Sequence, residues 1–285
     1  MKITLKDGSV KEYAESKSVY EIAQDISEGL ARAACCGMIN GEVVDLRTIV
    51  DADCELSICT ANDKEGLATI RHTTSHVMAE AVKNLFPDAK LTIGPSIDTG
   101  FYYDFDHAPF SREDLDKIEA EMKKIIKKGE KLEKFTMPRE EAIKFMEEKG
   151  EPYKVELIRD LPEDAEISFY SQGEFVDLCA GPHLMSTKNI KAYKLTSSSG
   201  AYPGGSAGPG IPRSGQSVHP LFYPSAQSPL SGCLYPYCPS ALAFSCCLCR
   251  YMTKQLYHKN DRFLKKKACR EIPGIQQAEE QGRAL

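Results

Sequence analysis

The sequence of 285 residues contains no tryptophan and no apolar stretch of the length that crosses a membrane. A membrane-spanning helix needs roughly 18 or more mostly apolar residues in a row, so we expect no embedded segment. Met1 leads directly into an alternating segment, residues 2–5, instead of the apolar core of a secretory signal. These absences favour a cytoplasmic protein.

The chain also lacks an excess of positive charge, because its formal net charge is −5. Proteins that coat nucleic acids through bulk electrostatics are strongly basic, and this class is therefore excluded. A local basic surface that contacts a nucleic acid is still compatible with this net charge.

Acidic residues are missing from one long part of the chain. No Asp or Glu occurs between Leu178 and Asn260, although the preceding residues are rich in both. Pro, Gly, Ser and Cys dominate residues 203–249, where neither helical nor alternating periodicity persists. We expect residues 203–285 to be an irregular or disordered tail. A frameshifted or wrongly joined reading frame best explains this composition, and a natural disordered tail is the alternative.

The eleven cysteines do not form a regular framework. Five precede residue 203 and six are crowded into residues 233–269. This uneven distribution, without a secretory signal, argues against a set of disulfides. The tail cysteines also lack two C-x2-C pairs, which argues against a zinc cluster in that segment.

Residues 1–61 predict a small domain of strands and one helix. The turns Asp7-Gly8 and Asn40-Gly41 lie between alternating segments and indicate two hairpins. Ser18, with a Glu three residues later, has the pattern of a helix N-cap, and apolar residues continue at helical spacing to Leu30. A strand near residue 57 ends the domain. This order of elements favours a β-grasp, ubiquitin-like fold.

Residues 62–202 predict a larger α+β domain. Helices are expected over about 66–85, from Ser111 onward with Asp114 as its capping-box partner, and from Pro138 to Gly150. Strands are expected at 91–93, 101–105, 153–159, 166–171 and 174–179. The predicted fold class is therefore α+β, with a β-grasp domain followed by a larger α+β domain.

Four side chains of ligand or acid–base type stand at informative spacings. His72 and His76 lie four residues apart on a predicted helix, so they project from one face. The apolar stripe of that helix centres almost opposite them, which makes them poor candidates for core histidines. Cys179 and His183 flank a Gly-Pro turn after a predicted strand. The set fits a tetrahedral zinc site or a metal-free hydrolytic pocket, and the spacing does not decide between them.

The residues around these positions resemble a known family. The matching segments are, in order, Arg71-His72-Thr73-Thr74-Ser75-His76, Ile93-Gly94-Pro95, Gly100-Phe101-Tyr102-Tyr103-Asp104, Tyr153-Lys154-Val155, and Val176-Asp177-Leu178-Cys179-Ala180-Gly181-Pro182-His183. Together they are similar to the editing domain, also called the second additional domain, of bacterial-type threonyl-tRNA synthetases. Residues 1–60 resemble the TGS domain that precedes it there. The combination of H-x3-H with C-x-G-P-H makes the resemblance specific.

The resemblance implies a proofreading esterase. Serine and threonine differ by one methyl group, and a pocket gains only about 1–3 kcal/mol from such a group. The family therefore hydrolyses seryl-tRNA(Thr) at a second site. By resemblance, the catalytic residues are His72, His76, Lys154, Cys179 and His183, and the substrate-binding residues are Tyr103 and Asp177.

The resemblance also implies roles for these residues. His72 and His183 are expected to lie nearest to the attacking water and the terminal ribose. Lys154 is expected to bind the carbonyl oxygen or the tRNA end. Asp177 is expected to bind the substrate amino group, and Tyr103 to shape the serine pocket. The β-grasp domain is expected to contact tRNA or a partner without chemistry of its own.

The family edits without a metal, so no cofactor is expected by resemblance. Zinc held by His72, His76, Cys179 and His183 is the less favoured alternative, because alanyl-type editing proteins carry zinc on a similar ligand set.

The resemblance ends abruptly after Gly200-Ala201-Tyr202. The family continues with Trp-Arg-Gly and a class II catalytic core, whereas this chain continues with Pro203-Gly204-Gly205. The ATP site and ligase activity are therefore expected to be absent. The expected partner is the acceptor end of tRNA(Thr), and a monomer is expected because the family's dimer contacts lie largely in the core. Two alternatives remain open: a non-catalytic tRNA-binding fragment, and a zinc protein of another purpose that uses the same residues.

Overall fold

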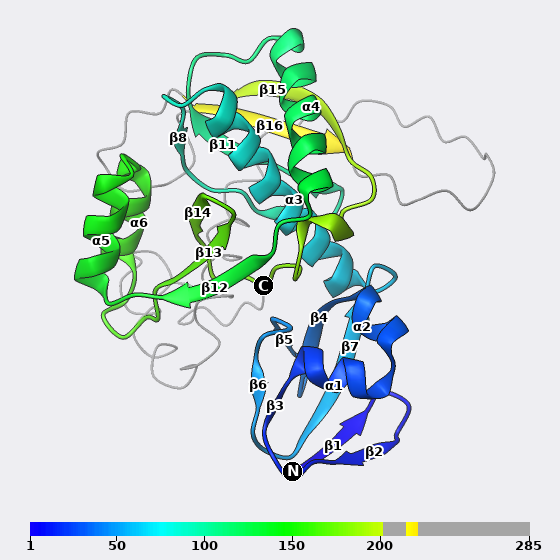
Figure 1. Ribbon diagram of the computed structural model, residues 1–285. Coiled ribbons are helices and arrows are strands. Elements are labelled where there is room, and N and C mark those ends of the chain that lie inside the picture. The colour runs from blue at the N-terminus through cyan, green and yellow to red at the C-terminus, as the bar shows by residue number, and fades with distance from the viewer. Residues whose placement is uncertain (202–214, 222–285) are drawn as a thin grey trace, which may run out of the picture. The chain divides into compact units, whose positions relative to one another are not determined.

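The computed structural model describes residues 1–201 and 215–221, and Figure 1 labels their helices and strands. Apart from residues 215–221, the predicted tail lies outside the described residues, as does its expected irregular structure. No helix of the described part is long and apolar enough to cross a membrane.

The first 60 residues form a five-stranded sheet against which a helix packs. The sheet has the order β2-β1-β7-β4-β5, in which only the central pair β1 and β7 is parallel. The elements are β1 (Lys2–Leu5), β2 (Val10–Glu12), β3 (Lys17–Ser18), α1 (Val19–Ile26), α2 (Glu28–Ala33), β4 (Ala34–Ile39), β5 (Glu42–Val44), β6 (Ile49–Val50) and β7 (Cys54–Thr60). Val19 and Ile22 of α1 pack on Ile3 and Leu56 of the sheet. This arrangement confirms the predicted β-grasp fold.

The single helix predicted from Ser18 to Leu30 is divided into α1 and α2. Ser18 caps α1 as predicted, because its hydroxyl accepts from the Glu21 N–H while the Glu21 carboxylate accepts from the Ser18 N–H. Ser27 ends α1 in an extended conformation and accepts from the Leu30 N–H at 3.0 Å. A serine side chain that bonds the local backbone competes with helix continuation, which explains the break.

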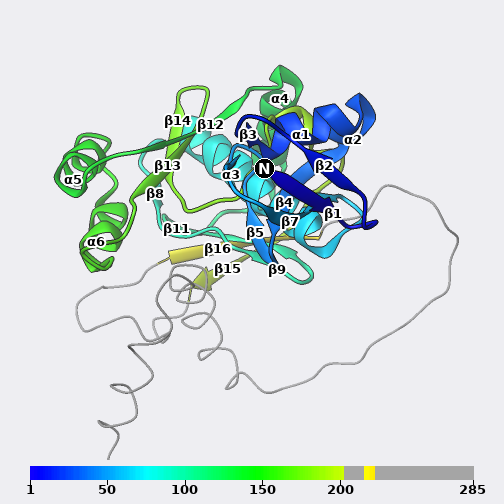
Figure 2. The same ribbon diagram turned by 90° about the horizontal axis from the view of Figure 1, so that it is seen from below.

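The larger part of the chain surrounds one long helix, α3 (Lys64–Leu85). The elements that follow it are β8 (Lys90–Leu91), β9 (Ser96–Ile97), β10 (Gly100–Phe101), β11 (Tyr103–Asp106), α4 (Arg112–Lys128), β12 (Leu132–Thr136), α5 (Arg139–Glu148), α6 (Pro152–Asp160), β13 (Ser168–Gln172), β14 (Phe175–Leu178), the 3-10 turn η1 (Thr187–Asn189), β15 (Lys194–Ala201) and β16 (Gly215–Leu221). One sheet has the order β8-β11-β16-β10-β9 with β15 beside β16, and a second has the order β12-β13-β14. Figure 2 shows β15 and β16 side by side.

Strand β16 belongs to the segment that was predicted to be irregular. Its backbone pairs antiparallel with β15, from Lys194 opposite Leu221 to Ala201 opposite Gly215, and with β11 on its other side. The local sequence gives no alternating signal here. The strand is specified by the two edges that it joins, because their backbone N–H and C=O groups require partners.

The predicted strand at 153–159 is wrong, because these residues form the helix α6. Pro152 stands in the first turn of this helix, where its missing N–H costs no hydrogen bond. Lys154, Val155 and Ile158 are its buried residues. Two adjacent inward positions are incompatible with a strand that buries one face, and they fit the period of a helix.

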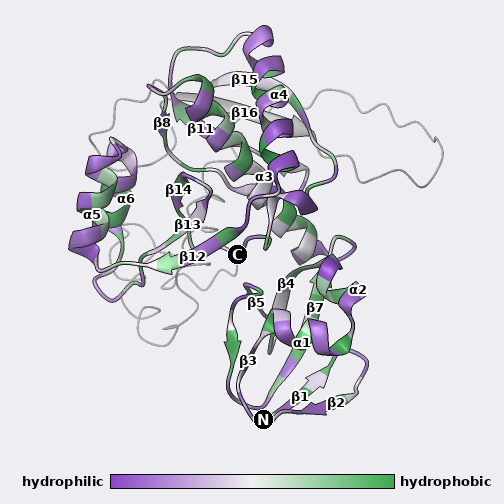
Figure 3. Cartoon of the chain, viewed as in Figure 1, coloured by the Kyte–Doolittle hydropathy of each residue, from purple (hydrophilic) through white to green (hydrophobic). Residues whose placement is uncertain are grey.

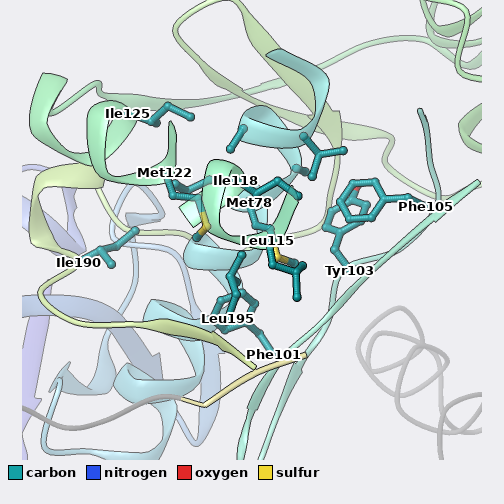
Figure 4. Packing of buried hydrophobic residues seen from close by; sticks show 14 of the residues in the cluster. Met78, Phe101, Tyr103, Phe105, Leu115, Ile118, Met122, Ile125, Ile190 and Leu195 are labelled. Atoms are coloured by element: carbon teal, nitrogen blue, oxygen red, sulfur yellow. The ribbon is translucent and has the colours of Figure 1, made fainter. Parts of the chain in front are cut away.

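Helix α3 is buried on all sides along its middle, where every residue from Thr73 to Val82 is buried. Figure 4 shows Met78 among Leu115, Ile118 and Phe101 of the main apolar cluster. On the opposite side of α3, Glu80 accepts a hydrogen bond from Gln172 of β13, and the His76 ring contacts Phe175 of β14. The expectation that His76 is not a core histidine is therefore wrong, because only 4% of its surface is exposed.

Helix α4 packs on α3 through a narrow apolar face. Ser111 caps it through the capping box that the sequence predicted, with Asp114 as the reciprocal acceptor. Leu115, Ile118 and Met122 are buried, while Figure 3 shows hydrophilic residues elsewhere along the helix. This amphipathic pattern places α4 between the core and solvent.

Gly66 makes a close packing contact that yields a testable prediction. A Cβ at this position would lie 1.9 Å from the Thr60 carbonyl oxygen, so Gly66→Ala forces β7 and α3 apart. We expect the free energy of unfolding to fall by about 1–3 kcal/mol in urea titrations. The control is Gly29→Ala, whose nearest atom lies at 3.8 Å; it should retain or slightly increase stability. Equal unfolding free energies for the two variants would contradict the close contact between Gly66 and the Thr60 carbonyl.

Candidate functional site

Two segments bring the four ligand-type side chains together. His72 and His76 come from α3, and Cys179 and His183 come from the loop that follows β14. The donor atoms of all four residues lie within 4.8 Å of one another. Cys179 Sγ lies 3.4 Å from His72 Nε2 and 3.2 Å from His183 Nε2. The structure thus joins residues that are more than 100 positions apart.

The loop that carries Cys179 has little conformational freedom. The Cys179 N–H donates to the Ser168 carbonyl oxygen at 3.0 Å, and the Gly181 N–H contacts Cys179 Sγ at 3.3 Å. Gly181 has a φ of 78°, and a Cβ on it would lie 2.2 Å from the Tyr170 hydroxyl. Only glycine meets both conditions at this position, so the close turn depends on it.

Hydrogen bonds orient two of the three imidazoles toward the thiol. His72 Nδ1 lies 3.3 Å from the Pro182 carbonyl oxygen, which can only accept. His183 Nδ1 lies 3.1 Å from Thr73 Oγ1, whose own hydrogen is donated to the Thr69 carbonyl. Both rings therefore carry their proton on Nδ1. Their Nε2 lone pairs face Cys179.

These two imidazoles are neutral at physiological pH. Burial lowers the pKa of His72 to about 4, against the partly opposing effect of the Pro182 carbonyl. Burial also lowers the pKa of His183 well below its usual value, and the neighbouring His72 and His76 lower it further. Neutral imidazole is the form that binds metals and accepts protons.

A buried ionic group lies beside the imidazoles. Asp177, which is 1% exposed, lies 2.6 Å from Lys154 Nζ and accepts from the Tyr103 hydroxyl at 2.6 Å. His76 Nε2 lies 3.8 Å from the same carboxylate. Burial raises the pKa of Asp177, but the adjacent Lys154 ammonium group, with contributions from His76 and the Tyr103 hydroxyl, outweighs this effect and lowers it. Asp177 therefore stays ionised, and all seven residues singled out in the sequence meet around one centre.

The expectation of a metal-free site is corrected by this geometry. In tetrahedral zinc sites the ligand bonds of about 2.0–2.3 Å separate neighbouring donors by roughly 3.3–3.7 Å. Cys179 Sγ lies 3.4 Å from His72 Nε2, within this range, and 3.2 Å from His183 Nε2, just below it. The fixed Nδ1–H groups are the outer contacts that metal-binding histidines usually make. His72, His76, Cys179 and His183 thus form a zinc-binding set.

Three residues that support the site were missed in the sequence. Thr73 lies inside the segment 71–76, so its proximity could have been recognised. Asp45 and Tyr170 are 125 positions apart, yet the Tyr170 hydroxyl donates to Asp45 Oδ2 at 2.9 Å. No local pattern marks such a pair, because the contact exists only after the domains fold.

A separate hollow of about 350 Å³ lies further along α3. Its lining includes Glu80, Lys83, Lys128, Glu130, Glu151 and Phe175. Phe175 also contacts the His76 ring, with a centroid separation of 6.4 Å. Burial raises the pKa of Glu80 to about 7, although its hydrogen bond from Gln172 acts in the opposite direction.

Sequence profiles of two known domains match the chain. The TGS domain matches residues 1–60, and the Threonyl and Alanyl tRNA synthetase second additional domain matches residues 167–213. The second match contains Asp177, Cys179 and His183.

Several curated relatives are similar to most of the described residues. The threonine–tRNA ligase of Acetivibrio thermocellus is 64% identical over 203 residues, which are 71% of this chain and 32% of that protein. The enzymes of the same name from Clostridium botulinum Alaska E43 and Clostridioides difficile 630 are 64% and 57% identical over 203 residues, 71% of this chain and 31% and 32% of theirs. The chain spans about a third of the length of these relatives. The predicted resemblance is confirmed.

The donor set predicts stoichiometric zinc. Protein purified without chelators should contain about one zinc ion per chain by mass spectrometry of the metal, since imidazole nitrogens and a cysteine thiolate suit this ion. Cys179→Ser should lose most of it. The matched control is Cys54→Ser, which changes a thiol outside the set and should retain the metal. Zinc-free parent protein would contradict the assignment.

Glu80 predicts a pH dependence of stability. Its folded pKa of about 7 lies above the value of 4.5 for an unperturbed carboxyl group. The folded state binds the Glu80 proton more tightly than the unfolded state does. The stability that this proton provides is therefore complete below pH 4.5 and lost as the pH rises through 7. Glu80→Gln should gain about 1–3 kcal/mol over the parent between about pH 5 and about pH 8 in urea unfolding. The control Glu174→Gln changes an exposed neighbour and should show no such gain. If the difference in unfolding free energy between Glu80→Gln and the parent does not change with pH, burial is not the cause.

Proposed function

We propose that this chain, which carries the N-terminal TGS and second additional domains of a threonyl-tRNA synthetase, hydrolyses serine from mischarged tRNA(Thr). The observation that carries the proposal is the zinc-type cluster of His72, His76, Cys179 and His183 beside a buried Lys154–Asp177 pair. The proposed partner is the acceptor end of tRNA(Thr). Monomeric state and cytoplasmic location remain predictions.

The proposed domains are residues 1–61, 62–202 and 203–285, and strand β16 of the last segment completes the sheet of the second domain. Separate apolar clusters support the first boundary. Ile3, Val19 and Leu56 belong to one cluster, whereas Val77, Phe101 and Ile118 belong to another.

Asp177 and Lys154 provide opposite charges for the aminoacyl end. The ionised Asp177 carboxylate uses one oxygen for Lys154 and the other for Tyr103. Each carboxylate oxygen has a second lone pair, and these remain to bind the substrate ammonium group. The Lys154 ammonium has further N–H donors for the ester carbonyl oxygen. Stabilisation of the negative charge that develops on this oxygen is a large contribution to ester hydrolysis.

Tyr103 forms a rigid wall for side-chain selection. Its ring is fully buried, and its hydroxyl is fixed by Asp177. On one side the ring packs so closely on Gly94 that a Cβ there would lie 2.1 Å from Cδ2. A wall that cannot move rejects an additional methyl group through overlap. The pocket therefore admits serine more readily than threonine.

His72 and His183 are the residues assigned to the attacking water. Both rings are neutral and present Nε2 lone pairs to the same point. His72 is only half-buried, which gives water access from that side. Zinc held by these residues with His76 and Cys179 would supply Lewis acidity toward water or the ester carbonyl.

Deacylation of radiolabelled seryl-tRNA(Thr) by the full chain tests the proposal. We expect hydrolysis well above the buffer rate and slower hydrolysis of threonyl-tRNA(Thr). His72→Ala should reduce the rate about 10²–10⁴-fold, because it removes a group at the reaction centre. His107→Ala is the matched control, since His107 stacks on Phe110 away from the cluster, and it should hydrolyse normally. A parent chain no faster than buffer would reject the proposed activity.

A further inference from the structure

Asp45 of the N-terminal module, the β-grasp part of the chain at residues 1–60, contacts the site directly. We propose that Asp45 and Arg47 are positioning residues, which hold the backbone around His183 for the reaction. This inference rests on the proposed hydrolysis for its kinetic consequence. It assigns to the module a part in the chemistry, whereas the sequence indicated only an accessory contact.

Asp45 binds the backbone of a residue in the cluster. It is 7% exposed, and its Oδ2 accepts from the His183 N–H at 3.1 Å and from the Tyr170 hydroxyl at 2.9 Å. Its other oxygen accepts from the Arg47 N–H at 2.9 Å and from Arg47 Nη1 at 2.8 Å. Both carboxylate oxygens are thus occupied, and the charge is balanced by Arg47.

Arg47 binds the backbone on both sides of this contact. Its guanidinium donates to the carbonyl oxygens of Leu132, at the start of β12, and of Leu184, the latter at 3.1 Å. A further contact to the His183 carbonyl measures 3.4 Å. A planar guanidinium offers several fixed donors, which a lysine cannot reproduce. One side chain therefore ties the His183 loop to the neighbouring sheet.

The same contacts reach the imidazole of His183. The Tyr170 ring, whose hydroxyl is held by Asp45, lies against this imidazole with a centroid separation of 4.5 Å. On the other side, Thr73 Oγ1 contacts His183 Nδ1 and accepts from the Leu184 N–H. The ring is held between α3 and a tyrosine that Asp45 orients.

Loss of the Asp45 carboxylate leaves four groups without this partner. These are the His183 N–H, the Tyr170 hydroxyl, the Arg47 N–H and the Arg47 guanidinium, and unpaired buried groups of this kind are costly. The loop can regain partners only by moving, which displaces His183 Nε2 from its place 3.2 Å from Cys179 Sγ. Displacements of about 1 Å in a reaction centre reduce rates by up to about 10²-fold.

The kinetic test compares Asp45→Ala, Asp45→Asn and Asp53→Ala in the full chain. Asp53 also bonds a backbone N–H, that of Lys2 at 2.7 Å, but within the module. We expect Asp45→Ala to lower kcat for seryl-tRNA(Thr) about 10- to 100-fold with KM nearly unchanged. Asp45→Asn keeps an acceptor oxygen and should recover part of the rate, and Asp53→Ala should retain the parental rate.

Hydrogen exchange of the 180–186 peptide separates this inference from the proposed activity. Asp45→Ala should accelerate exchange there, and Asp53→Ala should not. If Asp45→Ala unfolds, Arg47→Lys is used instead, because it keeps the positive charge but lacks the paired donors of the guanidinium group. If the parent chain does not hydrolyse seryl-tRNA(Thr) but Asp45→Ala still accelerates exchange in this peptide, the proposed function is rejected and the Asp45 contact is supported. Parental exchange and parental kcat in the folded Asp45 or Arg47 variant would overturn the positioning role.

Discussion

Burial of uncharged imidazoles requires a fixed partner for each ring nitrogen, and much of the fold around the site supplies these partners. For His72 the partner of Nδ1 is the Pro182 carbonyl, and for His183 it is the Thr73 hydroxyl. The Thr73 hydroxyl can accept because α3 places the Thr69 carbonyl in reach of its hydrogen. The helix thus determines the tautomer of a residue more than 100 positions away, and thereby directs the Nε2 lone pairs to Cys179.

Charges in this interior are paired rather than isolated. Lys154 balances Asp177 next to the cluster, and Arg47 balances Asp45 behind the loop. Such pairs are not a strong source of stability, because desolvation opposes their attraction. Their value here is geometric, since each carboxylate also binds a group that must not move: the Tyr103 hydroxyl in one case and the His183 N–H in the other.

The zinc-type set and the ionic pair divide the site into two halves. One half has nitrogen and sulfur donors, and the other has a carboxylate, an ammonium group and a phenol within 2.6 Å contacts. An aminoacyl ester carries both a reacting carbonyl and a charged amino group, so it offers a partner to each half. This complementarity connects the geometry to the proposed hydrolysis.

Local patterns predicted many of the elements. The capping boxes of Ser18 and Ser111 and the Asn40-Gly41 hairpin depend on neighbours within four residues, and each formed as predicted. The segment 153–159 alternates as a strand does, but Pro152 in front of it begins the helix α6. The break at Ser27 was missed because a serine side chain can serve either the helix or a new cap.

The sequence by itself determined the candidate side chains. Residue types and short spacings indicated the histidine pair and the C-x-G-P-H turn, since a helix or a turn fixes neighbours directly, and the family resemblance added Lys154, Tyr103 and Asp177. Only the tertiary structure decided that the four donors lie within 4.8 Å of one another, that His76 is buried, and that Asp45 reaches His183. Those facts depend on chain segments that meet through packing, and separation along the chain carries no record of such a distance.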